Sequence, residues 1–256
     1  MKKVTAKDFE NFLANLDLKK YEKLRNIKTV EQDLPKKLNP LFLLYEKYWE
    51  ERRFMDYDSF FEIYWDRNIK EICKFAKKYF YGCSLEFVQE GFKARIYRTW
   101  MSVLTQFHFQ YLWEDLFGKD YPLKASAELD IKGVDSLIAF GNFRIGIQIK
   151  KISYRKEASE RRFKLGRKEK QLIDKICEVP YVVIDIAELE RKIESKRVKE
   201  ENKKMYAKLL SFFEKYLIKF PNGFVIFKRD YLKRVKEAIE SAIDSDKDKI
   251  PYDYFL

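Results

Sequence analysis

The chain has 256 residues, and its 53 Lys and Arg against 41 Asp and Glu give a formal net charge of +12. This length allows one large domain, or one domain with an accessory lobe. A basic balance is typical of a protein with an anionic partner, most often nucleic acid. A lysine-rich surface adapted to a hot habitat is the alternative explanation. No apolar run approaches membrane-spanning length, so no membrane partner is expected, and the polar start of the chain does not resemble a signal peptide.

Cysteine and histidine usage excludes several kinds of site. The cysteines, Cys73, Cys83 and Cys177, follow no metal-ligand spacing and fit a reducing cytoplasm, where we expect the protein to act. His108 is the single histidine, which excludes zinc triads and other sites built from several histidines. It lies in an aromatic segment, and we expect it to pack in the core.

The first part of the chain is expected to be helical. Residues 1–80 carry apolar side chains at helical spacing, interrupted at Pro35 and Pro40. Residues 85–117 form the longest amphipathic segment, which we expect to end at Gly118. We therefore predict a helical N-terminal region over residues 1–84 and a core over 85–256.

The middle of the chain predicts three short strands. Residues 127–131 are expected as a leading strand, which would place Glu128 and Asp130 on one face. Residues 134–140 and 143–151 are expected as a hairpin, because Gly141 and Asn142 suit a tight turn.

The predicted hairpin brings polar side chains together at one end of a sheet. Asp135 would come level with Gln148 and Lys150, which share a face because strand side chains alternate. A carboxylate, a second oxygen ligand and a lysine suit metal-assisted phosphodiester hydrolysis, and Glu128 and Asp130 would enlarge the acidic group. The simpler alternative is a hairpin whose acid and lysine are merely solvated.

A strongly basic stretch follows the hairpin. Because its charge is lopsided, we expect it to contact phosphates, or guanine edges in the major groove, rather than to form an ordinary solvated helix. The candidate DNA-binding residues are Arg155, Lys156, Arg161, Arg162, Lys164 and Arg167.

The remainder is predicted as alternating helices and strands. We expect helices over residues 168–177 and 187–219, a buried strand over 181–186, a turn at 220–223 and a strand over 224–227. Residues 230–244 are expected as a final helix with Asp230 as its N-cap.

The order helix, three strands, helix, strand matches the core of the PD-(D/E)xK nucleases, with the acid on the second strand and Gln-x-Lys on the third. The predicted fold is therefore α/β (α+β), with a mixed central sheet flanked by helices and a helical N-terminal region. Phosphate-binding glycine loops and nucleophile elbows are absent from the sequence.

Several stretches spread over the chain resemble the TaqI family of type II restriction endonucleases. They are KTVEQDLPKKLNPLFLLYEKYW (28–49), ARIYRTWMSVLTQ (94–106), AELDIKGVD (127–135), GFVIF (223–227) and PYDY (251–254). The resemblance implies a Mg²⁺-dependent endonuclease that cuts double-stranded DNA at a short palindrome, TCGA in the namesake, and leaves 5′-phosphate ends. A palindromic site suggests a homodimer, and residues 1–84 would serve DNA binding or dimerisation.

By resemblance, Asp130 and Asp135 match the family's acidic pair. Strand alternation selects Lys150 as the lysine, whereas the family's spacing points to Lys151; we favour Lys150 and keep both. Gln148 stands where the superfamily usually has Glu or Asp. A DNA-binding protein that has lost activity, or a structure-specific repair nuclease on the same fold, are the alternative functions.

Overall fold

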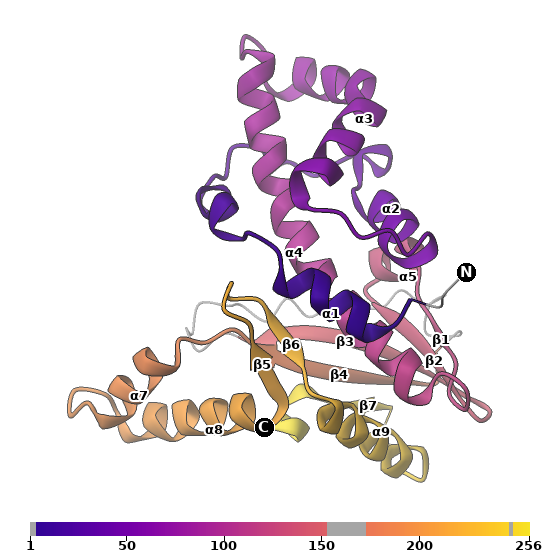
Figure 1. The fold of residues 1–256 in the computed structure, drawn as a ribbon, viewed down its shortest axis with the longest axis vertical. Coiled ribbons are helices and arrows are strands. Elements are labelled where there is room, and N and C mark those ends of the chain that lie inside the picture. Colours follow the sequence, from indigo (N-terminus) through magenta and orange to yellow (C-terminus); the bar gives the residue numbers. More distant parts are fainter. Residues whose placement is uncertain (1–3, 153–172, 246–247) are drawn as a thin grey trace. The chain divides into compact units, whose positions relative to one another are not determined.

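The computed structural model describes residues 4–152, 173–245 and 248–256 (Figure 1). The chain forms two compact units. One comprises the residues up to 107 together with 221–223, and the other comprises 108–220 together with 224–256. The division of the chain into 1–84 and 85–256 stays a prediction.

The first unit is helical, as expected. Its elements are α1 (Ala6–Ala14), η1 (Lys19–Arg25), η2 (Lys36–Leu38), α2 (Leu41–Leu44), the π-helical turn η3 (Tyr45–Glu50), α3 (Tyr57–Tyr79) and the N-terminal part of α4 (Leu85–Phe117). Its core is aromatic: the Trp100 indole donates to the Tyr48 hydroxyl at 2.8 Å, which in turn donates to the Met55 carbonyl at 2.5 Å. The hydrogen bonds of these two buried groups offset the cost of removing them from water.

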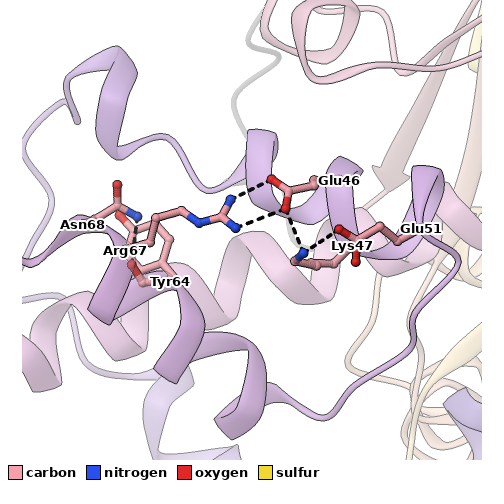
Figure 2. A network of polar contacts seen from close by, with 6 residues as sticks. All are labelled: Glu46, Lys47, Glu51, Tyr64, Arg67 and Asn68. Atoms are coloured by element: carbon pink, nitrogen blue, oxygen red, sulfur yellow. Dashed lines mark hydrogen bonds and ion pairs between the residues drawn. The ribbon is translucent and has the colours of Figure 1, made fainter.

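A network of ion pairs joins η3 to α3 (Figure 2). The Arg67 guanidinium donates to both oxygens of the Glu46 carboxylate, at 2.6 and 3.1 Å. Lys47 lies between Glu46 and Glu51, with its Nζ at 2.8 and 2.5 Å from their carboxylate oxygens. The bidentate geometry fixes the π-helical turn against α3.

Two arginines of α4 hold the extended segment around Val30. Arg95 donates to the carbonyls of Val30, at 3.1 Å, and of Gln32, while Arg98 donates to the Ile27 carbonyl at 2.5 Å. This segment contains the TVEQDLP stretch noted in the sequence, and two of its backbone carbonyls, those of Val30 and Gln32, are satisfied by an arginine rather than by regular secondary structure.

The second unit is built on a mixed sheet. Among the described residues the strands run in the order β1-β2-β3-β4-β7, antiparallel across β1, β2 and β3 and parallel across β3, β4 and β7 (Figure 1). Their bounds are β1 (Leu123–Lys124), β2 (Ser136–Phe140), β3 (Phe143–Ile152), β4 (Lys175–Val182) and β7 (Lys249–Ile250). A second, two-stranded sheet pairs β5 (Leu217–Lys219) with β6 (Val225–Phe227). The expected fold class is confirmed.

Helices flank this sheet. They are α5 (Ala127–Ile131), α7 (Ile186–Glu194), α8 (Glu200–Tyr216), α9 (Arg229–Ile243) and the short η4 (Tyr252–Phe255), with the C-terminal part of α4. The expected β2–β3 hairpin is present, with Phe140 opposite Phe143 and Gly141 at φ 61° in the turn. His108 is fully buried and stacks on Phe227, as expected for a packing residue. No helix in the described part of the chain is long and apolar enough to cross a membrane.

The expected leading strand over 127–131 is wrong, because these residues form helix α5 and the leading strand is β1. The Ser126 side chain accepts the Leu129 N–H at 3.3 Å and acts as the N-cap. The five-residue pattern of apolar and polar side chains was too short to distinguish a helix from a strand, and the Ser126 cap stabilises the helix. Glu128 and Asp130 are two residues apart on a helix, so they do not share a face.

The expected helix over 168–177 is wrong in its described part, because Lys175 begins strand β4. That strand continues through Pro180, which was expected to precede a strand running from 181 to 186. The Ile176 N–H donates to the Asp248 carbonyl at 2.9 Å, so it points away from β3. Pro180 is four residues farther along β4, so its backbone nitrogen points to the same side as that of Ile176. Pro180 therefore faces the edge that β7 leaves uncovered, where a proline removes no ladder bond.

Two further boundaries differ from expectation. The single helix expected over 187–219 is divided into α7, α8 and strand β5. The N-cap of α9 is Lys228 rather than Asp230, which lies in the first turn. An acid in the first turn favours the helix through its dipole, which explains why the sequence pattern resembled a cap.

Candidate active site

Asp135 is anchored where β2 begins. Its Oδ2 accepts the Ile149 N–H at 2.5 Å, and its own N–H donates to the Ile147 carbonyl at 2.9 Å. The Gln110 amide of α4 donates to the Asp135 carbonyl at 2.8 Å. The side chain and both backbone groups of Asp135 are thus bonded, and the residue is only 8% exposed.

Two other residues of the predicted site, Asp130 and Lys150, influence the pKa of the Asp135 carboxyl. Burial raises the pKa of the Asp135 carboxyl well above its ordinary value, and the negative charge of Asp130 raises it further. The Ile149 N–H and the positive charge of Lys150 oppose this rise in pKa. Asp130 and Lys150 therefore both lie within electrostatic range of Asp135.

Gln148 and Lys150 lie on one face of β3, because they are two residues apart in a strand. The buried Gln148 side chain donates from Nε2 to the Gly133 carbonyl at 2.6 Å. Since the amide nitrogen is engaged in this way, the amide oxygen is the atom with which Gln148 can serve a water or a cation.

Lys150 and Lys151 have different surroundings. Lys150 is half-buried, and its Nζ is paired with the carboxylate of Glu178 on β4. Lys151 is exposed and points to the opposite face of the strand. The structure therefore brings Lys150, and not Lys151, to the face that carries Gln148.

The sequence reasoning missed Glu178. It lies in register with Gln148 across the parallel pair β3–β4, and its side chain is 3% exposed. The segment was assigned to a helix that ended before it, so its place in the sheet was not foreseen. An acid next to a continuous apolar run, EVPYVVI, was the available signal.

The two acidic residues before Asp135 both lie in α5 and point to different sides of this helix. Asp130 is half-buried and acts electrostatically on Asp135, whereas Glu128 is exposed on another side of the helix. In the ranges that the structure describes, no three His, Cys, Asp or Glu side chains gather as a metal site.

The donor set nevertheless suits Mg²⁺. This ion binds through one or two carboxylates, substrate phosphate oxygens and water, rather than through a cage of protein ligands. Asp135 is a buried carboxylate that is destabilised by its neighbour Asp130. A divalent cation bound at this site would offset that repulsion, and Asp135 and Asp130 are the residues that would hold it.

The candidate DNA-binding residues of the basic stretch lie outside the described residues. They are Arg155, Lys156, Arg161, Arg162, Lys164 and Arg167.

Comparison with known proteins decides the family. The family model described as TaqI restriction endonuclease matches residues 6–239. The type II restriction enzyme TthHB8I of Thermus thermophilus is 42% identical over 250 residues, 96% of this chain and 92% of the relative. The type II restriction enzyme TaqI of Thermus aquaticus is 44% identical over 234 residues, 89% and 85% of the two chains.

The chain belongs to the TaqI restriction endonuclease family. The family resemblance read from the five sequence stretches is thereby confirmed. Membership makes the chain an enzyme, a type II site-specific deoxyribonuclease that acts on DNA. No solved structure was found to match it.

Proposed function

We propose that this restriction endonuclease hydrolyses double-stranded DNA at TCGA in a Mg²⁺-dependent reaction, leaving 5′-phosphate and 3′-hydroxyl ends. The observation that supports the chemistry is the hydrogen bond from the Ile149 N–H to the Asp135 carboxylate, which places Asp135 beside the end of β3 that carries Gln148 and Lys150. The negative charge of Asp130 is close enough to raise the pKa of that carboxyl. The TCGA site rests on the similarity to TaqI, with which 44% of 234 aligned residues are shared.

Each side chain has a distinct part in the proposed reaction. Asp135 and Asp130 hold the cation, and Glu128 stays a predicted assisting ligand. When bound, Mg²⁺ supplies Lewis-acid stabilisation of the charge that develops on the phosphate. The anchoring of Asp135 on the Ile149 N–H fixes its carboxylate before DNA arrives, so that little reorganisation is needed at the moment of reaction.

Gln148 and Lys150 act on the water and the phosphate. The Gln148 amide, held by the Gly133 carbonyl, presents its oxygen to orient the attacking water. Lys150 donates hydrogen bonds to the scissile phosphate and stabilises its negative charge in the transition state. Lys151, on the other face, remains the alternative lysine that the family spacing indicates.

Binding and assembly complete the proposal. A palindrome is most simply cut on both strands by a two-fold homodimer, with one active site for each strand. We propose that the basic residues from Arg155 to Arg167 contact the DNA, and that residues 1–84 serve DNA binding or dimerisation. A cytoplasmic location agrees with the free cysteines among the described residues.

A digestion with matched substrates tests this function. One plasmid carries a single TCGA site, and its control carries TGCA at the same position, with the same base composition. With Mg²⁺, we expect one linear product from the first plasmid only, with sequenced ends inside TCGA and 5′-phosphates that permit religation. Cleavage of both plasmids, cleavage only of branched DNA, or unchanged DNA would each contradict the proposal, and sedimentation analysis with a TCGA duplex tests the dimer.

A further inference from the structure

Lys150 is paired with a buried carboxylate that belongs to a different strand. Glu178 of β4 lies in register with Gln148, and the Lys150 Nζ donates to its Oε1. The Glu178 side chain is 3% exposed, whereas that of Lys150 is 35% exposed. The Lys150 ammonium group therefore binds a buried carboxylate while part of its own side chain stays exposed to solvent.

Glu178 is itself held by the end of the chain. Lys249 of β7 places its Nζ at 2.7 Å from the same Oε1, and the Tyr252 N–H donates to Oε2 at 3.3 Å. Tyr252 belongs to the PYDY stretch, to which the sequence alone assigns no role. β7 and η4 thus connect the end of the chain to the candidate catalytic lysine through a single carboxylate.

Glu178 is held as an anion by these contacts. Burial alone would raise the pKa of its carboxyl, but the hydrogen bonds and positive charges of Lys150 and Lys249 outweigh burial and lower it. One carboxylate shared between two ammonium groups leaves a net positive charge. The cluster formed by Lys150, Glu178 and Lys249 can therefore still attract a phosphate although Lys150 is paired with Glu178.

The chemistry of lysine explains why such a partner is useful. An ammonium group has three donor N–H bonds and sits on a flexible four-carbon stem. One bond to Glu178 fixes the end of the stem and leaves two donors for the phosphate and the attacking water. Preorganised donors stabilise a transition state more than donors that must first be ordered.

We propose that Glu178 is a positioning residue that holds the Lys150 ammonium at the scissile phosphate, with Lys249 preserving the positive charge of the cluster. This inference rests on the proposed role of Lys150. It gives the closing segment of the chain a part in cleavage although that segment supplies no group that touches DNA in the proposed reaction.

The first test compares the cleavage rates of Glu178→Gln and Lys249→Gln with that of the wild-type enzyme. The rates are measured in single turnovers at saturating enzyme, on a duplex that the wild type cuts. Glu178→Gln keeps an acceptor oxygen but removes the negative charge that holds the Lys150 ammonium, and we expect a loss of about 10-fold or more in rate. Lys249→Gln leaves the Glu178 charge in place but removes one positive charge of the cluster, so we expect a smaller loss, of about 2- to 3-fold. Affinity for the duplex without Mg²⁺ should not fall in Glu178→Gln, because the cluster becomes more positive. Glu178→Asp keeps the charge but shortens the side chain, and we expect an intermediate rate.

The second readout does not depend on cleavage. The wild type and Glu178→Gln are treated with an amine-acylating reagent, and modification of each lysine is followed by mass spectrometry. We expect Lys150 to be modified several-fold faster in the variant. Lys175, which lies on the strand of Glu178 and donates to the Ser245 carbonyl at 2.7 Å, should react at an unchanged rate and reports that the strand is intact.

The outcomes separate the inference from the proposed function. Full cleavage rates in Glu178→Gln and Glu178→Asp would overturn the inference even if Lys150→Gln were inactive. A parallel rise in Lys175 modification, with a lower melting temperature, would show that Glu178 only supports the fold. Normal cleavage by Lys150→Gln would instead refute the proposed role of Lys150.

Discussion

The carboxylate of Asp135 accepts the backbone N–H of Ile149, the residue that lies between Gln148 and Lys150 on β3. This bond joins the start of one strand to the end of its neighbour at a distance of 2.5 Å. It places the Asp135 carboxylate at the same end of the sheet as Gln148 and Lys150. Substitutions of these residues can therefore test whether they act in one site.

Replacing Asp135 with Asn should abolish cleavage but leave DNA binding intact. The substitution keeps the shape and the acceptor for Ile149 but removes the charge that holds the cation, so we expect a loss of at least about 10²-fold in rate. Gel-shift affinity without Mg²⁺ and single-turnover cleavage measure the two effects. The matched control is Asp244→Asn at the exposed end of α9, and normal cutting by Asp135→Asn would refute the assignment.

The adjacent lysines provide an internal comparison. Because Lys150 faces the site and Lys151 the opposite side, Lys150→Gln should slow cleavage by about 10²-fold or more, whereas Lys151→Gln should change it by less than about 5-fold. Both rates are measured at saturating enzyme, so that a loss of DNA affinity does not enter. The reverse order of the two effects would transfer the catalytic role to Lys151.

Mg²⁺ should stabilise the folded protein through Asp135. A ligand that binds only the native state raises the melting temperature with its concentration. We expect such a rise for the wild-type protein without DNA, and a much smaller rise for Asp135→Asn. Potassium chloride at equal ionic strength controls for general screening, and an equal response of both proteins to Mg²⁺ would place the cation elsewhere.

The Glu46 network should contribute a pH-dependent part of the stability. Hydrogen bonds from Arg67, and then from Lys47, lower the pKa of the Glu46 carboxyl to about 2. A lowered pKa in the folded state means that the stabilisation is present above the ordinary value of 4.5 and is lost as pH falls toward 2. The Glu46 side chain is 34% exposed, so we expect only about 1 kcal/mol at pH 7.

Thermal unfolding of Glu46→Gln across this pH range checks the sign. The variant should melt a few degrees below the wild type at pH 7, and the difference should shrink as pH falls from 4.5 toward 2. Glu62→Gln, on an exposed position of α3, is the control and should show no such convergence. A difference that stays constant with pH would mean that the network contributes through packing rather than charge.

The sequence by itself determined the family, the fold class and the hairpin of the site. The β2–β3 hairpin could be predicted because alternation and a Gly-Asn turn are local properties of neighbouring residues. The placement of Gln148 and Lys150 on one face follows from the same period of two. The stretches shared with the family are also local, and they identified it correctly.

Only the tertiary structure decided which residues surround Lys150. Glu178 is 28 residues from Lys150 in the chain and Lys249 is farther still, and their meeting depends on the parallel pairing of β3, β4 and β7. Parallel pairing joins distant segments, and no local pattern encodes its register. The capping of α5 by Ser126 likewise separated Glu128 from Asp130, because a helix and a strand present residues two apart in different directions.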